Sequence, residues 1–182
     1  YNNYEKGIDV SVGHIYEQFG SGLALRFWED RALGINNALF GAKVKYRFGE
    51  SITAKVVGGK QRIGMGFDLS DGVVYGADLD VDLTNLLNKE GYTIKLGGSF
   101  VGRYEDITEF TPSAPKTVNV FGPRVDYFGS NFNASVEYLF KTNSSYLSAK
   151  TLGLSLFYSD DLRYKEYYFK LNLDFNKYDK TK

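Results

Sequence analysis

The amino-acid sequence predicts an all-β fold of antiparallel strands, and three observations carry this prediction. Apolar and polar residues alternate with period two along most of the 182 residues, as in strands whose two faces meet different surroundings. Tyr, Phe and Trp, which favour strands, make up 16% of the chain, and only three prolines occur in it. Turn-forming residues separate the alternating runs at short intervals, which is typical of consecutive strands joined by tight turns.

About ten strands are expected from this alternation. They are predicted near residues 8–18, 22–29, 38–48, 51–61, 73–83, 91–104, 117–128, 131–141, 146–158 and 163–176. Turn signals between them are Gly49-Glu50, Gly129-Ser130, Asn143-Ser144-Ser145 and Asp160-Asp161. Longer connections are expected at 61–72 and 105–116, and residues 84–91 are a candidate short helical turn. No linker interrupts the pattern, so residues 1–182 are expected to form a single domain.

Two architectures fit antiparallel strands with one apolar and one polar face. A soluble sandwich or barrel buries the apolar face, whereas a transmembrane barrel turns it to lipid and encloses the polar face. Several expected strands are about 10–13 residues long, enough to span a membrane, and their polar faces are charged at mid-strand. Aromatic residues recur near strand ends, as in interfacial girdles: Phe40 and Phe48, Tyr92 and Tyr104, and Tyr167 and Phe175. These details favour an antiparallel transmembrane β-barrel.

Composition excludes several chemistries. The chain has no cysteine, so thiolate nucleophiles, disulfides and cysteine-ligated metals are excluded. Lys plus Arg and Asp plus Glu balance at 22 each, which argues against nucleic acid as a partner. No apolar run approaches the roughly 18 residues that a membrane-spanning helix needs. We expect no cofactor and no nucleic-acid partner.

The single histidine, His14, does not point to catalysis. A hydrolase site needs a histidine beside a nucleophile, and a metal site needs several ligands. His14 shares its face with Val10, Val12 and Tyr16, so an aromatic-like role on the apolar face is expected. A membrane lipase that uses His14 is the sharpest enzymatic alternative. Residues 56–66 lack the Gly-Lys-Ser/Thr ending of a phosphate loop, and the sequence predicts a protein that is not an enzyme.

Charged residues on the polar faces are the candidate site residues. Asp78, Asp80 and Asp82 lie roughly 6.5–7 Å apart along one strand, too far for all three to hold one Ca²⁺ unless a neighbouring strand completes the site. Two interpretations of the acidic and basic strands stay open. Opposed walls create a transverse field that selects solutes, or the charges pair across strands and each pair contributes little. The candidates for lining and selectivity are Glu17, Arg26, Glu29, Asp30, Arg31, Lys43, Lys45, Arg47, Lys55, Asp78, Asp80, Asp82, Lys95 and Arg103.

Residues 14–36 hold the only histidine and the only tryptophan around a Gly-Ser-Gly bend. A two-residue hairpin turn at Gly20-Ser21 would set Glu17 opposite Ala24 and bring Glu17 and Arg26 together on the luminal side. The same register turns the apolar members to lipid, namely His14, Tyr16, Leu23, Leu25 and Phe27. Glu29–Arg31 would follow as a loop that folds inward as a constriction or pins itself to the wall.

The blocks "GHIYEQFGSGLALRFWEDRALGINNALFGAKVKYRF", "GGKQR" and "DGVVYGADLDVDL" resemble an uncharacterised family of Bacteroidota outer-membrane β-barrel proteins. The resemblance covers about residues 10 to 85. It implies the outer membrane of a Gram-negative bacterium as the location, reached after a signal peptide is removed. It implies outer-membrane lipid as a partner and no particular activity. Members of the family are longer and this chain ends in "NKYDKTK", so we expect the 182 residues to be part of a larger barrel.

The expected function is porin-like passage of small hydrophilic solutes through a charged polar lumen. The alternative is a non-conducting accessory or scaffold subunit of an outer-membrane complex, for secretion, barrel assembly or nutrient uptake, with other outer-membrane proteins as partners. An open water path along the polar face would favour passage. Loops that plug this path would favour the scaffold.

Overall fold

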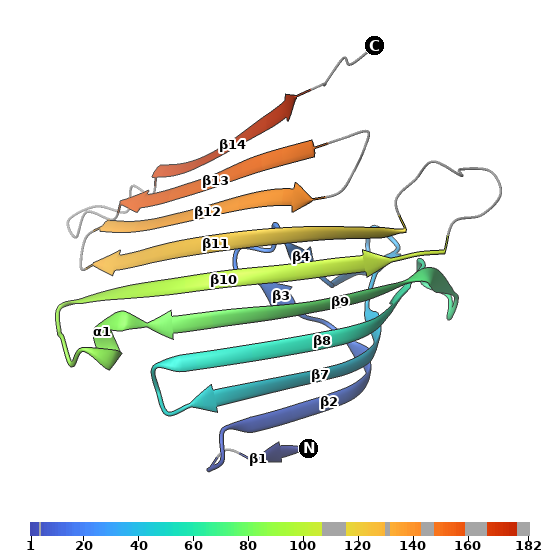
Figure 1. The fold of residues 1–182 in the computed structure, drawn as a ribbon, viewed down its shortest axis with the longest axis horizontal. Helices are drawn as coiled ribbons and strands as arrows, with labels where there is room; N and C mark the ends of the chain where they lie inside the picture. Colours follow the sequence, from blue (N-terminus) through green and yellow to red (C-terminus); the bar gives the residue numbers. More distant parts are fainter. Residues whose placement is uncertain (4, 107–115, 130–131, 143–147, 159–166, 178–182) are drawn as a thin grey trace.

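The computed structural model describes the chain except residues 4, 107–115, 130–131, 143–147, 159–166 and 178–182, and it confirms the all-β, antiparallel prediction (Figure 1). Ten strands form one sheet in which every neighbouring pair is antiparallel. In spatial order they are β1 (Asn2–Asn3), β2 (Ile8–Ile15), β7 (Leu39–Phe48), β8 (Ile52–Arg62), β9 (Leu69–Asp82), β10 (Tyr92–Tyr104), β11 (Thr117–Gly129), β12 (Phe132–Thr142), β13 (Ser148–Tyr158) and β14 (Tyr167–Lys177).

Nine of the expected strands correspond to β2 and β7–β14, and the strand predicted at 22–29 is wrong. That segment holds only short pairs that lie apart from the large sheet. β9 begins at Leu69, inside the connection expected at 61–72, so only residues 63–68 join it to β8. The connection expected at 105–116 lies largely outside the described residues, as do the turn signals at residues 143–145 and 160–161.

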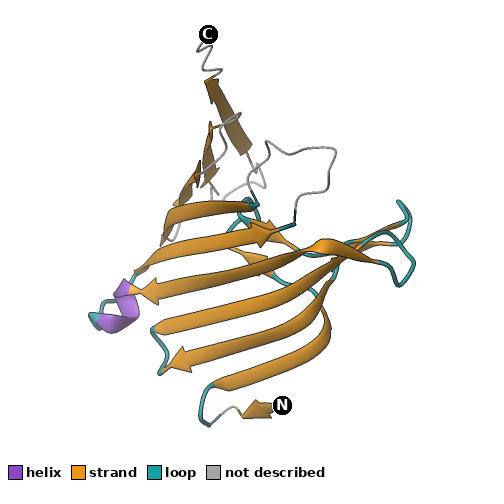
Figure 2. Ribbon diagram, turned by 45° about the vertical axis from the view of Figure 1, so that its right-hand side comes forward, coloured by secondary structure: helices purple, strands orange, loops and turns teal. Residues whose placement is uncertain are grey.

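Short connections join strands at one end of the sheet. Gly49, with a φ of +60°, and Glu50 form the β7–β8 turn, as the sequence predicts. The helix α1 (Leu83–Leu86) follows β9, where a helical turn is expected, and the Asp82 carboxylate accepts a hydrogen bond from the Asn85 N–H at 2.9 Å. Figure 2 shows α1 beyond the ends of the strands. Among the described residues, no helix is long and apolar enough to cross a membrane.

The sheet is open: β1 and β14 are its two edges, and the described strands form no closed barrel. Their order in space follows their order in the chain, apart from the short β3–β6 strands between β2 and β7. This up-and-down arrangement uses only connections between neighbours. The sheet curls, with one face turned to the viewer in Figure 1 and the other behind it.

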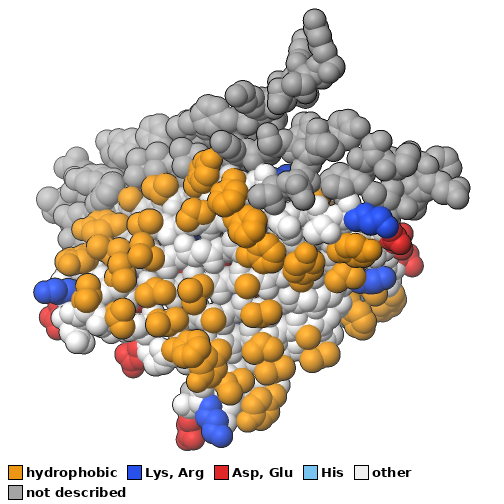
Figure 3. Space-filling model, viewed as in Figure 1, with side chains coloured by type: hydrophobic (Ala, Val, Ile, Leu, Met, Phe, Trp, Pro, Cys, Tyr) orange, Lys and Arg blue, Asp and Glu red, His pale blue; other side chains and the backbone are white. Residues whose placement is uncertain are grey.

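The two faces of the sheet have the opposite polarity to those of a sheet in a soluble protein. On the outer face, apolar side chains are exposed, with Val12 at 82% and Val56 at 56% of their full accessibility. On the inner face, charged side chains are buried, with Asp78 at 3%, Arg124 at 4% and Glu137 at 1%. Figure 3 shows hydrophobic side chains spread across the outer face and charged ones near its margins. A soluble half-buried sheet has the opposite arrangement.

The alternation read from the sequence assigns these faces correctly from β7 to β12. Phe40, Val44 and Leu79 lie exposed on the outer face, whereas Asp78 and Glu137 lie on the inner face. A strand with period-two patterning must separate its side chains in this way, because successive Cβ atoms point to opposite sides. The same prediction for Tyr167 to Phe175 concerns side chains outside the described ones.

Candidate functional site

Residues 16–38, here called the inserted segment, leave the sheet after β2 and lie on its inner face before the chain returns in β7. The segment contains the pair β3 (Gln18–Phe19) and β4 (Leu25–Arg26) and the pair β5 (Glu29–Asp30) and β6 (Ile35–Asn36). Figure 1 shows β3 and β4 behind the large sheet. The inner face of the large sheet, whose strands are here called the wall, is therefore covered in part by the chain's own residues.

The predicted two-residue hairpin at Gly20-Ser21 is wrong. β3 and β4 pair with Gln18 opposite Arg26 and Phe19 opposite Leu25, so the turn spans residues 20–24. Gly20 and Gly22 have φ values of +51° and +89°, and the Gly22 N–H donates to the Phe19 carbonyl at 2.8 Å. Two glycines with positive φ allow a longer loop to reverse the chain.

This register changes the surroundings expected for the apolar residues. Leu25 and Phe27, predicted to face lipid, are buried between the inserted segment and the inner face. His14 lies on the outer face as predicted, with its ring centroid 5.1 Å from that of Phe40. Arg26 does not join Glu17 but lies over the Trp28 ring, 5.0 Å from its centroid.

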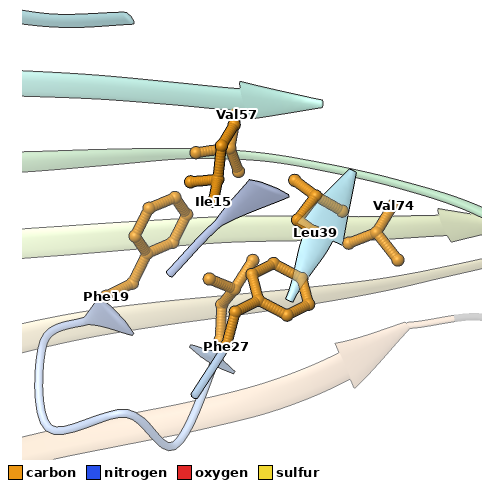
Figure 4. Close-up of a cluster of buried hydrophobic side chains, with 7 residues drawn as sticks. Ile15, Phe19, Phe27, Leu39, Val57 and Val74 are labelled. Carbon is orange, nitrogen blue, oxygen red and sulfur yellow. The ribbon is translucent and has the colours of Figure 1, made fainter. Parts of the chain in front are cut away.

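An apolar cluster fixes the inserted segment to the wall. Its members come from both partners: Ile15, Phe19, Leu25, Phe27, Leu39, Val57 and Val74, with Val101 packed against them. Figure 4 shows the Phe19 and Phe27 rings directed at the aliphatic side chains of the strands. The Phe19 ring lies over Gly76, where a Cβ atom would come within 2.9 Å of it. Glycine in β9 thus makes room for the ring.

Glu17 ties the base of the inserted segment to the basic strands. Its carboxylate lies 3.1 Å from the Lys43 Nζ and 3.3 Å from the Lys55 Nζ. Burial alone would raise the pKa of the Glu17 carboxyl, but Lys55 and Lys43 outweigh it and hold this pKa below 4.5, its ordinary value. Lys55 also lies 3.6 Å from Asp78, which connects Glu17 to the acidic strand β9.

Arg124 is the centre of a charge network on the inner face. Its guanidinium pairs with Asp80 and lies 3.4 Å from Asp78, 3.6 Å from Asp126 and 3.8 Å from Glu137. The Ser99 hydroxyl donates to Asp78 at 2.7 Å, and the Ser135 hydroxyl donates to Asp126. Four carboxylates thus surround one cation, two of them buried (Asp78 and Glu137), and hydrogen bonds satisfy part of their remaining acceptor capacity.

The β3–β4 turn reaches this network. The Ser21 N–H donates to the Glu137 carboxylate at 3.1 Å, and the Ser21 hydroxyl donates to the same oxygen. Gly20 lies so close to Arg124 that a Cβ atom there would overlap the guanidinium. Glu137 and Arg124 belong to β12 and β11, more than one hundred residues away in the chain. The inserted segment is therefore anchored at its tip as well as at its base.

The structure brings some of the predicted site residues together. Glu17, Lys43, Lys55, Asp78 and Asp80 are linked by ion pairs, either directly or through Arg124. The basic and acidic strands are neighbours, with Lys55 directly opposite Asp78 in the β8–β9 register. These charges pair across strands, which is one of the two interpretations left open by the sequence. Asp78 and Asp80 share Arg124, and no group of metal-ligating side chains occurs among the described residues.

The other predicted site residues on the strands have different surroundings. Asp82 caps α1, Lys95 lies over the Phe128 ring, and Arg103 pairs with Glu105 at 2.8 Å. Lys45 and Arg47 lie near the end of β7, opposite Lys55 and Thr53.

The loop at Glu29–Arg31 is part of the inserted segment. Glu29 accepts from the Tyr16 hydroxyl at 3.4 Å, and Asp30 accepts from the Leu33 N–H at 3.1 Å. Arg31 is 3.3 Å from Glu29 and its side chain is 83% exposed. Glu29 and Asp30 thus shape the β5–β6 turn rather than contact the wall charges.

Sequence reasoning did not select Ser21, Ser99, Asp126 or Glu137 as site residues, nor Arg124 as their centre. The period-two pattern places Arg124 and Glu137 on the polar face of their strands. The pattern gives no register between distant strands, and Glu137 faces Arg124 only through the β11–β12 pairing. The contact between Ser21 and Glu137 has no local signal.

Comparison with known proteins gives a family but no activity. The model of a family of unknown function, DUF6029, matches residues 1–182. No curated protein and no solved structure matches the chain. The matched region includes the inserted segment and every strand of the sheet.

Proposed function

We propose that this chain, which belongs to the DUF6029 family of unknown function, forms the wall of an outer-membrane β-barrel that passes small hydrophilic solutes. The observation that carries the proposal is the inverted polarity of the sheet, whose outer face is apolar and whose inner face is charged. Lipid outside and water inside are the surroundings that suit such faces. The inserted segment narrows the lumen, and solutes pass beside it.

The extent of the exposed apolar surface supports the proposal that the sheet lies in a membrane. Large hydrophobic side chains are exposed on every strand from β7 to β12, for example Phe48, Val56, Leu79, Leu96, Val125 and Phe140. Soluble monomers rarely leave a contiguous apolar surface of this extent open to water. Outer-membrane lipid is the partner that would cover this surface. The proposal therefore includes the location that the sequence blocks imply, the outer membrane of a Gram-negative bacterium of the Bacteroidota.

The unpaired edges of the sheet, β1 and β14, bear on how a barrel would close. An unpaired strand edge cannot face hydrocarbon, because its N–H and C=O groups would lack hydrogen-bond partners. The sheet ends at β1 and β14, so in a barrel these edges pair either with each other or with further strands. We assign such further strands to the rest of a larger barrel.

Conductance measurement tests the passage of solutes. Folded protein in planar bilayers should give stepwise conductance. Phe19→Ala, which removes an anchoring ring of the inserted segment, should increase the step. Leu33→Ala, at an exposed position of the same segment, is the matched control and should leave the step unchanged. Silence of both the folded wild type and the folded Phe19→Ala variant would contradict passage.

A non-conducting scaffold subunit is the second candidate, and the anchoring of the inserted segment favours it. A segment held by the buried Phe19 and Leu25, and by a buried contact at Glu137, forms a stable plug. A scaffold should co-purify with fixed outer-membrane partners in mild detergent and stay silent in bilayers. Conductance from the purified chain would exclude it.

A further inference from the structure

A polar pocket lies away from the charge network, where the β5–β6 pair meets the β8–β9 loop. Its volume is about 400 Å³, within the range of small-molecule sites. The connections at residues 16–38 and 63–68 lie at this end of the strands, whereas the β7–β8 turn and the β9–β10 connection that contains α1 lie at the other. Its polar lining comprises Asn36, Asn37, Gln61, Arg62, Ser70 and Arg103. The pocket is thus at the mouth of the proposed lumen.

Arg62 is held in place by neutral groups. Its Nε donates to the Gly66 carbonyl, its Nη2 donates to the Met65 carbonyl at 2.7 Å, and its guanidinium lies 5.0 Å from the Phe67 ring centroid. Among the described residues, no carboxylate lies within ion-pair distance of Arg62. These contacts leave other N–H donors of the guanidinium, and its full charge, unmatched.

The other lining residues include a second cation, Arg103, and a side-chain amide, Gln61, that has unused hydrogen-bond donors and acceptors. Arg103 lines the pocket while one of its nitrogens pairs with Glu105. The Gln61 side chain makes no hydrogen bond with any described residue. No carboxylate lines the pocket, although acidic and basic residues balance over the whole chain. An oriented guanidinium and an amide with unused donors and acceptors suit an anion that also carries hydroxyl groups.

We propose that this pocket binds a small solute that carries an oxyanion, a carboxylate or a phosphate group, beside hydroxyl groups. Arg62 supplies the charged donors, Gln61 hydrogen-bonds the hydroxyl groups, and Arg103 adds to the positive field. The inference goes beyond the proposed function, because binding at the mouth can be measured whether or not the protein conducts.

Calorimetry on the full chain in detergent tests this proposal, with D-glucuronate, D-glucose and inorganic phosphate as probes. D-glucuronate should bind at least about tenfold more tightly than D-glucose, and Arg62→Gln should weaken it about tenfold or more, because a charged hydrogen bond is lost. Arg103→Gln should weaken it less. Lys60→Gln, which removes an exposed charge from β8 outside the pocket, is the matched control and should have no effect.

Comparing the binding of inorganic phosphate with that of D-glucuronate shows whether the site recognises a sugar acid or the oxyanion group alone. Binding of D-glucuronate alone identifies a sugar acid, and equal binding of phosphate identifies a site for the oxyanion itself. Equal binding of D-glucose and D-glucuronate, no binding of either anion to folded protein, or equal losses in Arg62→Gln and Lys60→Gln would overturn the proposal. Circular dichroism of each variant verifies the fold, so a lost site is separated from a lost structure.

Discussion

At the scale of single residues, Arg124 connects more of the inner face than any other described cation. It contacts carboxylates on β9, β11 and β12, and one of them, Glu137, also holds Ser21 of the inserted segment. A buried charge of this kind is stabilised only while its partners remain. Arg124 therefore links the strand pairing of the wall to the position of the segment.

Arg124→Met should lower the free energy of unfolding by about 3–5 kcal/mol, because it leaves Glu137 buried without its cation and leaves Asp78 with Lys55 alone. Urea titration followed by circular dichroism measures the loss. Arg31→Met is the matched control, since the Arg31 side chain is 83% exposed, and it should change stability by less than about 0.5 kcal/mol. Equal losses in the two variants would contradict the role given to Arg124.

The Glu17 carboxylate should make the base of the inserted segment sensitive to acid. Since its folded pKa lies below the unfolded value of 4.5, its stabilising effect is complete above pH 4.5 and is lost as the pH falls through the folded pKa. Trp28, the only tryptophan, lies in the segment, so its fluorescence should change below pH 4.5. Glu17→Gln should lack this step, and an unchanged step in that variant would assign the acid response elsewhere.

At the scale of elements, the inserted segment is a self-contained unit with an apolar base, a charged contact and an anchored tip. Its four short strands pair only with one another. Its contacts to the wall come from side chains, from the Ser21 N–H and from the Ala38 carbonyl, which accepts from the Arg62 N–H at 2.8 Å. Such a segment can detach without breaking the hydrogen bonds of the large sheet. Its position therefore depends on packing at a few side chains.

Phe19→Ala should lower the stability of the folded protein by about 3–5 kcal/mol, because it removes a fully buried ring that packs over Gly76. We expect the loss to appear mainly as release of the segment, with Trp28 becoming more exposed while the strands remain. Tryptophan fluorescence and circular dichroism together separate the two effects. Leu33→Ala, exposed on the same segment, should change neither; parallel loss of both signals in Phe19→Ala would show that the segment does not detach independently.

The same element shows where prediction from sequence succeeds and fails. The wall strands were predictable because each alternates over many residues, and alternation is a local property. The β3–β4 register was not, because Gly20, Ser21 and Gly22 permit several turn lengths that differ little in local energy. Burial of Leu25 and Phe27 against β8 and β9 selects the longer turn, and this contact is not local.

The candidate site was predictable to a similar extent. Alternation places Glu17, Lys55, Asp78 and Arg124 on polar faces, but their contacts depend on strand order and register. The pairing of Arg124 with Glu137 joins strands whose relative register no local pattern specifies. The sequence therefore indicated the kind of face, and the sheet determined which charges meet.

At the scale of the whole molecule, the main feature is the polarity of the sheet: its apolar face is exposed and its charged face is buried. With water on both faces, the large hydrophobic side chains of the outer face would remain uncovered. In the orientation that we propose, a bilayer would cover that face and the inner face would line a lumen. Passage, scaffolding and the pocket at the mouth all presuppose this orientation.

Site-directed labelling in liposomes tests this orientation most directly, because the chain has no cysteine of its own. Single cysteines at Val44 and Val56, on the outer face, should resist a water-soluble maleimide and report lipid contact through a membrane-phase quencher. A cysteine at Leu33, exposed in the inserted segment, should react fully with the soluble reagent. If Val44→Cys and Val56→Cys react as fast as Leu33→Cys in folded, liposome-bound protein, the outer face does not meet lipid.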